Sequence, residues 1–207
     1  NAASLGSFTS ANLAGALTDE TGSGSAVFAT SPTLTSPTLT SPIIAGTPSG
    51  VGVLTSSSVQ SLTTTAVNFT SIPSWAKRIT VNYIGLSTNG TAPPLIQLGY
   101  GATTYLTSGY VGATDMFQTT PSVSLISAGI NLNGSVSQAA EVYQGCLTLT
   151  LMGTASWVGV LLGSSTGTAR LCFTSSTIDV PSTLTAIRFY INGTQVFDSG
   201  SANIMYE

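Results

Sequence analysis

A five-residue unit is repeated three times between residues 31 and 45 and places a proline at every fifth position. The segment runs Ser-Pro-Thr-Leu-Thr, Ser-Pro-Thr-Leu-Thr, Ser-Pro-Ile-Ile-Ala, with prolines at 32, 37 and 42. Proline fixes φ and has no amide proton, so neither an α-helix nor a central β-strand can continue through this segment. The repeat therefore predicts an extended backbone.

Large aliphatic side chains recur with the same period, at Leu34, Leu39 and Ile44. Side chains alternate between the two faces of a strand, so an odd period sends successive aliphatic residues to opposite sides. One flat sheet cannot bury all three. Three chains wound around each other can, because each side chain then turns inward at a different height. The alternative is a disordered linker rich in Pro, Ser and Thr; the regular aliphatic spacing favours a trimeric shaft.

The segment before the repeat contains one candidate for a short helix. Ser10 is a suitable N-cap, and Leu13, Ala16 and Leu17 follow the i, i+3, i+4 pattern of one helix face. Two turns of helix are not stable alone, so we expect this face to pack on copies of itself. Residues 1–61 are thus predicted to form an extended shaft that trimerises through Leu13, Leu17, Leu34, Leu39 and Ile44.

Residues 62–207 have the composition and alternation of an all-β domain. About ten short stretches rich in Val, Ile, Thr and Tyr are separated by turn residues. This pattern predicts a β-sandwich, jelly-roll-like in architecture. The predicted strands are 66–69, 78–86, 95–99, 103–110, 122–125, 141–151, 157–162, 169–174, 183–191 and 195–198.

Three Asn-Gly dipeptides, at 89–90, 133–134 and 192–193, mark expected turns in this domain. The last is flanked by Phe-Tyr-Ile and Gln-Val-Phe. Asn and Gly both tolerate positive φ, so residues 189–197 are predicted to form a hairpin with a type I′ turn.

Charged residues are unusually scarce. The chain has 4 Lys+Arg, 7 Asp+Glu and no His, and its charged fraction of 5% compares with about 25% in an ordinary domain. A surface of Ser, Thr, Asn and Gly suits fibres and proteins exposed outside cells. Nucleic acid is not an expected partner, because binding to phosphates needs clustered cations and Lys77-Arg78 is the only adjacent basic pair. We expect that pair to meet an Asp or Glu.

The same scarcity argues against catalysis, metals and cofactors. Without His, a serine nucleophile lacks its usual base, and the carboxylates of the β domain are scattered without a motif, at Asp115, Glu141, Asp179, Asp198 and Glu207. Cys146 and Cys172 lie in apolar runs, where two buried free thiols are favoured over one disulfide. There is no transmembrane-length apolar run and no signal-peptide pattern. Because the chain starts at Asn1 rather than Met, we expect it to be part of a longer protein.

Several stretches resemble bacteriophage tail-fibre proteins. SANLAGALTDETGSGSAVFATS (10–31), followed by the SPTLTSP repeat, is similar to a segment near the shaft of such fibres. FTSIPSWAKRITVNYIGLSTNG (69–90) and RFYINGTQVFDSGSANIMYE (188–207) are similar to the opening and the close of their C-terminal domain. The resemblance implies a homotrimeric virion appendage, joined to other tail proteins through an N-terminal part and contacting the host surface with its β domain. Residues 91–187 carry no such resemblance.

A glycine-rich stretch offers a candidate receptor-binding patch of Tyr100, Tyr105, Tyr110, Asp115 and Gln118. Aromatic faces stack on sugars and short polar groups bind hydroxyls without needing charge. The alternative is that these tyrosines are ordinary strand residues or cover the trimer interface. Trp75 and Trp157 are expected to be packing residues.

The sequence thus predicts a non-enzymatic tail-fibre protein that attaches the virion to a glycan or protein on the host bacterium. Three alternatives remain open. One is a purely structural head or collar fibre without a receptor. Another is a polysaccharide depolymerase, although such enzymes have longer β-helical bodies. The third is a bacterial surface adhesin.

Overall fold

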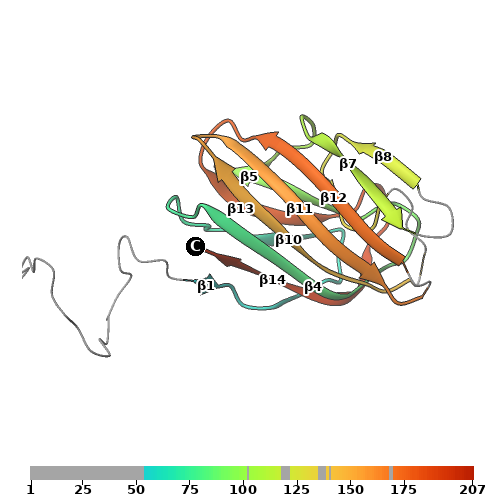
Figure 1. The fold of residues 1–207 in the computed structure, drawn as a ribbon. Coiled ribbons are helices and arrows are strands. Elements are labelled where there is room, and N and C mark those ends of the chain that lie inside the picture. The colour runs from blue at the N-terminus through green and yellow to red at the C-terminus, as the bar shows by residue number, and fades with distance from the viewer. Residues whose placement is uncertain (1–53, 102, 118–121, 135–138, 140, 168–169) are drawn as a thin grey trace, which may run out of the picture. The chain divides into compact units, whose positions relative to one another are not determined.

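A computed structural model describes residues 54–101, 103–117, 122–134, 139, 141–167 and 170–207 of the chain. These ranges are all-β and antiparallel and contain no helix (Figure 1). Within them, no helix has the length and apolar character needed to cross a bilayer. The predicted short helix, the repeat and the five aliphatic trimerisation residues lie outside the described ranges.

Nine strands form the larger sheet, in the order β1-β14-β4-β10-β11-β12-β7-β8, with β2 also paired to β14. Every pairing in it is antiparallel. The strands span Thr55–Ser56 (β1), Gln60–Ser61 (β2), Arg78–Thr88 (β4), Val111–Phe117 (β7), Ser122–Ile126 (β8), Tyr143–Met152 (β10), Ser156–Ser165 (β11), Arg170–Asp179 (β12) and Phe197–Tyr206 (β14).

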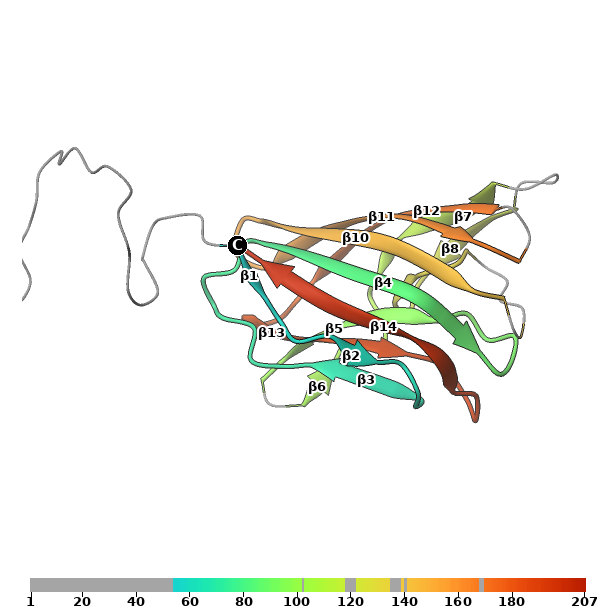
Figure 2. The same ribbon diagram turned by 90° about the horizontal axis from the view of Figure 1, so that it is seen from below.

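The smaller sheet has five strands, in the order β3-β13-β5-β6, with β9 also paired to β5. They span Ala66–Phe69 (β3), Leu95–Tyr100 (β5), Thr104–Tyr105 (β6), Ile130–Asn131 (β9) and Leu184–Tyr190 (β13). Figure 2 shows this sheet beneath the larger one, so the domain has a two-layered, sandwich-like arrangement.

The core lies between the two sheets and is built from alternate residues of each strand. Along β4, for example, Ile79, Val81 and Tyr83 are buried while the residues between them are not. Tyr83 from the larger sheet meets Phe189 from the smaller one edge-on, with ring centroids 6.2 Å apart. Phe189 is fully buried and also contacts the ring of Phe197. Truncating such a side chain to Ala costs about 3–5 kcal/mol.

The chain repeatedly crosses from one sheet to the other. It passes from β3 to β4 to β5, and later from β12 to β13 to β14, changing sheet at each step. Some consecutive strands instead stay in one sheet: β5 and β6 pair in the smaller sheet, whereas β7–β8 and the meander β10–β11–β12 stay side by side in the larger one.

This crossing overturns the predicted hairpin at residues 189–197. β13 ends at Tyr190 in the smaller sheet, whereas β14 begins at Phe197 in the larger sheet, and the two strands do not pair. Gly193 has positive φ (80°) but Asn192 does not, so the turn is not type I′. The amides of Ile191 and Phe197 instead bond to the carbonyls of Thr65 and Thr64. The Asn192-Gly193 dipeptide therefore lies in a turn that connects the two sheets, not in a hairpin within one sheet.

Two predicted strands had the wrong extent. The stretch 103–110 was expected to be one strand, but only Thr104–Tyr105 pairs with β5, and Gly109 (φ 86°) precedes the unpredicted strand β7. β14 was expected over 195–198 and instead continues to Tyr206. Its Ser, Gly and Asn residues weaken the β-propensity of that segment, and pairing with β4 on one side and β1 and β2 on the other outweighs this.

A pair of glycines allows β14 to bend alongside β4. The register shifts on both sides of Ser199, and Gly200 (φ 113°) lies beside Gly85 (φ 68°) of β4. Both conformations are left-handed, which favours glycine. A side chain at Gly200 would also meet the backbone of Leu86.

The strand pairings begin before residue 62, the expected start of the domain. β1 pairs with the end of β14, Thr55 opposite Tyr206, and β2 pairs with its middle. Leu62 is fully buried.

Candidate interaction surfaces

The predicted tyrosine patch is not assembled as one surface. Tyr110 is 3% exposed and lies in the core. Tyr105 lies on the smaller sheet and Asp115 on the outer face of the larger one. Tyr100 packs, partly buried, against the core, and Gln118 lies outside the described residues. Of the five residues, only Tyr100 and Tyr105 lie on strands that pair with each other, β5 and β6.

Tyr105 contacts a residue that the sequence analysis did not single out, Arg188 on β13. The guanidinium carbon lies 4.4 Å from the centroid of the Tyr105 ring and 4.5 Å from that of Tyr190. Burial raises the pKa of Tyr105, and the charge of Arg188 offsets part of that rise. Arg188 and Tyr190 are two residues apart on one strand, and side chains at that spacing point to the same face of a sheet. The sequence therefore contained a signal for this contact.

Arg188 is also oriented by a buried amide. Its Nε donates to Oε1 of Gln97 at 2.7 Å, and Nε2 of Gln97 donates to the carbonyl of Ala128 at 2.7 Å. Gln97 is 1% exposed and lies directly opposite Arg188 on β5. The guanidinium is thus fixed by two rings and one hydrogen bond.

The second surface is the outer face of the larger sheet. Here large apolar side chains share the outward positions of β7, β8, β10, β11 and β12 with Ser, Thr, Gln and Asp residues, and their exposed fractions run from 43% at Phe173 to 87% at Leu125. We call this set the apolar face: Val111, Phe117, Val123, Leu125, Met152, Val160, Leu162, Leu171 and Phe173. Within the described ranges, nothing covers it.

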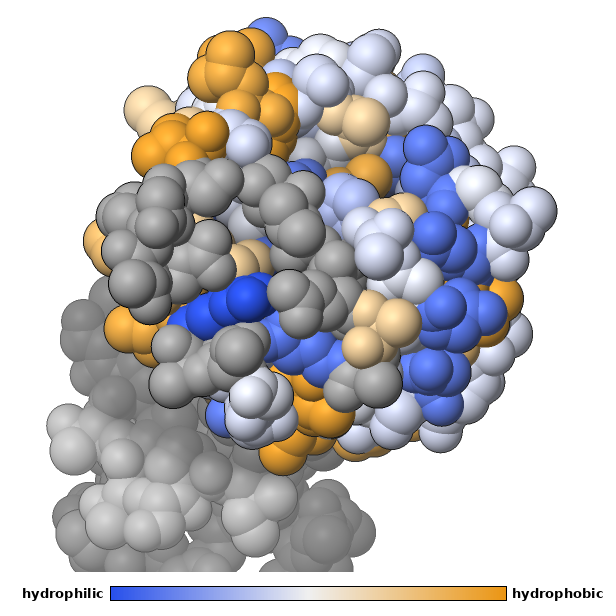
Figure 3. Space-filling view, turned by 90° about the vertical axis from the view of Figure 1, so that its right-hand side faces the viewer, coloured by the Kyte–Doolittle hydropathy of each residue, from blue (hydrophilic) through white to orange (hydrophobic). Residues whose placement is uncertain are grey.

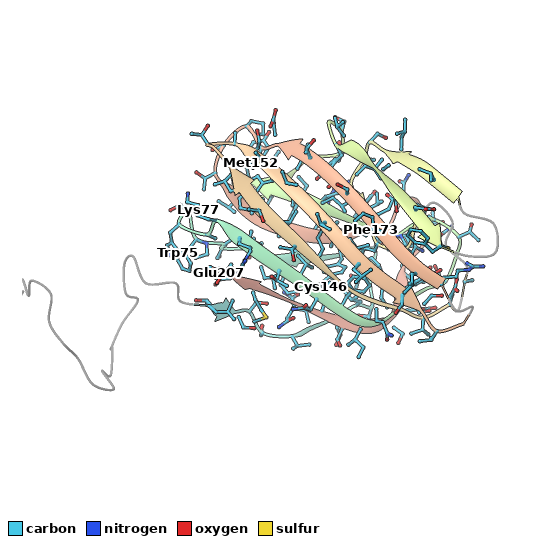
Figure 4. All side chains as sticks on the ribbon, viewed as in Figure 1. Trp75, Lys77, Cys146, Met152, Phe173 and Glu207 are labelled. Carbon is cyan, nitrogen blue, oxygen red and sulfur yellow. The ribbon has the colours of Figure 1, made fainter. Side chains whose placement is uncertain are left out.

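Strand register brings the members of the apolar face together. Leu162 lies opposite Phe173, and Leu171 lies opposite Phe117. Cross-strand neighbours of this kind are about 5 Å apart. Figure 3 views the domain from one end, with apolar atoms gathered at the upper left, the side of the larger sheet, and polar atoms prevailing on the right. Figure 4 shows Met152 and Phe173 on the same broad face.

One carboxylate sits inside this face. Asp115 lies between Phe173 and Val123 in the register of the sheet. Its Oδ1 is enclosed and has no hydrogen-bond partner among the described residues. Leaving such an acceptor unsatisfied costs about 1–3 kcal/mol.

An open depression of about 190 Å³ lies farther along the same sheet, between β4, β14 and the loop at Val59. Nδ2 of Asn82 donates to Oδ1 of Asn203 there, at 3.3 Å. The volume is below the roughly 300–1,000 Å³ of a typical ligand pocket.

Two other described carboxylates, Glu141 and Asp179, have separate partners. Glu141 is buried and accepts hydrogen bonds from Tyr143 (2.8 Å), Ser165 (2.5 Å) and Nη1 of Arg170 (3.2 Å). Asp179 accepts from the hydroxyl of Ser156 at 2.6 Å. Among the described residues, no group of three or more His, Cys, Asp or Glu could hold a metal ion.

The predicted ion pair at Lys77-Arg78 is confirmed for Arg78, which pairs with Glu207. Both side chains are well exposed, so the pair contributes little stability. Trp75 lies nearby (Figure 4), 41% exposed, with its ring 5.7 Å from that of Tyr206. Trp157 is buried, as expected of a packing residue.

Both cysteines are free thiols, as favoured from the sequence, but only Cys172 is buried as expected. They lie on opposite sides of the larger sheet: Cys146 is exposed on its outer face, and Cys172 is buried. Burial raises the pKa of the Cys172 thiol, which keeps it protonated and unreactive near neutral pH.

Searches of family models, curated proteins and solved structures find nothing that matches this chain.

Proposed function

We propose that this chain is a non-enzymatic phage tail-fibre protein that assembles as a homotrimer and attaches the virion to its host bacterium. The observation that carries the proposal is the uncovered apolar face of the larger sheet. Nine exposed large apolar side chains on one face of a sheet mark an interaction surface rather than ordinary solvent-exposed surface.

The size of the apolar face suits a protein interface. A large apolar side chain has a surface of roughly 150–250 Å², so nine of them at these exposures leave on the order of 800 Å² uncovered. That is about what one partner contributes to a standard interface, whereas the largest patch on a typical monomer is roughly 300–600 Å².

The occupant we propose is a second copy of this chain, with the apolar face turned toward the three-fold axis. The face carries little charge: the outward positions of its strands contribute Asp115 and Asp179. The SPTLT repeat supports the same partner, since its spacing favours sister chains lying together.

The finer architecture we propose is a shaft with a short helix, followed by a jelly-roll-like sandwich. The sheet changes at β3–β4–β5 and β12–β13–β14 support the jelly-roll comparison. The β10–β11–β12 meander departs from it.

Attachment follows from the trimer. Burying the apolar face leaves the outer face of the smaller sheet open in each copy. Three equivalent weak sites then bind together, because the first contact raises the effective concentration of the other two. The N-terminal part would connect the fibre to other tail proteins.

Size-exclusion chromatography with light scattering tests the assembly. We expect the mass of three chains, and a monomer at micromolar concentration would contradict the proposal. Binding of labelled trimer to susceptible cells tests the attachment; a trimer that binds no host cell would instead favour a purely structural fibre. Release of reducing sugar from host polysaccharide would contradict the non-enzymatic assignment.

A further inference from the structure

We infer that Arg188, with Tyr105, Tyr190 and Gln97, forms a binding site for an acidic saccharide, one that carries a carboxylate or phosphate group. The inference rests on the proposed function for the source of this ligand, the host surface. The chemistry of the site depends on the described residues alone.

Arg188 is a cation without a counterion in the part of the chain that the structure describes. The two other arginines there are each paired, Arg78 with Glu207 and Arg170 with Glu141. Arg188 contacts two rings and an uncharged amide, but no carboxylate. Its described hydrogen bond uses Nε, so the two terminal amino groups remain as donors for an anion.

The guanidinium is held in place before any ligand arrives. Arginine side chains lose much rotamer freedom when they are fixed, and that cost reduces binding. Here Gln97 and the two rings have already fixed Arg188. Gln97 is itself held by the carbonyl of Ala128 and enclosed. The planar fork of the guanidinium matches a carboxylate or phosphate, which a lysine does not.

The surroundings of Arg188 suit a sugar ring. Tyr105 and Tyr190 are partly exposed, so their edges and remaining faces can meet sugar C–H groups. Asn68 lies opposite Arg188 on β3 and is exposed, which places an amide where it can bind hydroxyls. A nucleic acid is a poorer fit, because its many phosphates need several cations and the whole chain has 4 Lys+Arg.

Three oligosaccharide probes of equal length test the site on the full chain: oligogalacturonate for the carboxylate, a phosphorylated dextran oligomer for the phosphate, and the unmodified dextran oligomer as the uncharged control. Isothermal titration calorimetry compares the unchanged chain with Arg188→Lys and Arg188→Gln. Lys77→Gln serves as the matched control, because it removes the same charge from an exposed side chain in the loop before β4. Thermal unfolding confirms that each variant is folded.

We expect at least one acidic probe to bind more than tenfold tighter than dextran. Both Arg188 substitutions should weaken that binding by roughly 10- to 100-fold, the loss of a charged hydrogen-bonded pair, while Lys77→Gln leaves it within about twofold. Should Arg188→Gln fail to fold, Tyr105→Leu removes one ring and should weaken binding severalfold. Three results would each overturn the site. In the first, dextran binds as tightly as the acidic probes. In the others, Lys77→Gln loses as much affinity as the Arg188 variants, or Arg188→Lys retains full affinity.

Host-cell binding separates this inference from the proposed function. Cell binding that persists in Arg188→Gln overturns the site and leaves attachment standing. A chain that binds an acidic probe through Arg188 but binds no cell keeps the site and overturns attachment. If the Arg188 variants lose both probe binding and cell binding while Lys77→Gln keeps them, the result supports the site and the attachment function together.

Discussion

The hydroxyl of Tyr110 accepts a hydrogen bond of 2.8 Å from the backbone amide of Leu98, inside the core. It also donates, at 3.3 Å, to the carbonyl of Leu106. Leu98 lies on β5 between the stretches that pair with β9 and with β6. A side chain thus provides the bond that a neighbouring strand would otherwise make.

Replacing Tyr110 with Phe keeps the ring and removes this bond. The amide of Leu98 is then buried without a partner, which costs about 1–3 kcal/mol. We expect urea unfolding to show that loss. Tyr206→Phe, at a partly exposed tyrosine, should change stability by less than about 0.5 kcal/mol. An unchanged midpoint for Tyr110→Phe would contradict the role of the bond.

Alkaline pH should destabilise the domain. Burial raises the pKa of Tyr110 to about 12, raises that of Tyr83 well above its ordinary value, and raises that of the Cys172 thiol. Above pH 10.0 the unfolded chain loses these protons first, so it binds fewer protons than the folded chain and stability falls as pH rises.

For Tyr110 the loss is on the order of 2 kcal/mol by the time pH reaches its folded-state pKa. Urea midpoints measured from neutral pH upward test this. The decline should be shallower in Tyr110→Phe, and a midpoint that stays constant through the alkaline range would rule the mechanism out.

The buried pair of Glu141 and Arg170 should be sensitive to loss of one partner. Their side chains are only 4% and 14% exposed. Glu141→Ala removes the acceptor of Tyr143, Ser165 and Arg170 together, and we expect a loss of about 3–5 kcal/mol. Asp198→Ala, at an exposed acid, is the control. Equal thermal midpoints for the two variants would show that the pair is not needed.

An acidic substitution on the apolar face should weaken the proposed trimer. Leu162 is exposed in the single chain, so Leu162→Asp leaves the fold intact but places a charge in the contact between copies. We expect trimer dissociation at a protein concentration at least about tenfold higher than for the unchanged chain. Thr194→Asp, in an exposed turn, should dissociate as the unchanged chain does. Identical sedimentation of both variants would remove this face from the interface.

Gly200→Ala should destabilise the bend of β14. The residue has φ 113°, and a Cβ there meets the backbone of Leu86. Strain of this kind costs about 1–3 kcal/mol. The matched change is Gly153→Ala, which has φ 69° but open space around its Cβ position, so it should lose less. Equal losses would show that crowding at Leu86 contributes nothing.

The local sequence pattern predicted where strands occur better than which strands pair with each other. The alternation of β4 and β10 indicated their buried faces, because that period depends only on neighbouring residues. The Asn192-Gly193 hairpin was wrong because a turn dipeptide does not specify which sheet the next strand joins. The stretch 103–110 was misjudged because its composition does not show that pairing with β5 ends at Tyr105.

The candidate site depends on contacts between residues that are far apart in the sequence. Tyr105 and Tyr110 look alike in the sequence, yet one is at the surface and the other in the core. Arg188 meets Gln97 and Tyr105 only because β13 pairs with β5 and β5 with β6. The apolar face was not evident from the sequence, because Leu171, Cys172 and Phe173 are all apolar and only the structure shows which of them point outward.

The pairing of Thr55 with Tyr206 has a practical consequence for experiments. A fluorophore or affinity tag attached after Glu207 would emerge beside the point where the described domain begins, and would crowd that end. The opposite end, where β4 finishes and β14 starts, would remain clear. Probes meant to report on the free end are better placed in the turn at residues 192–194.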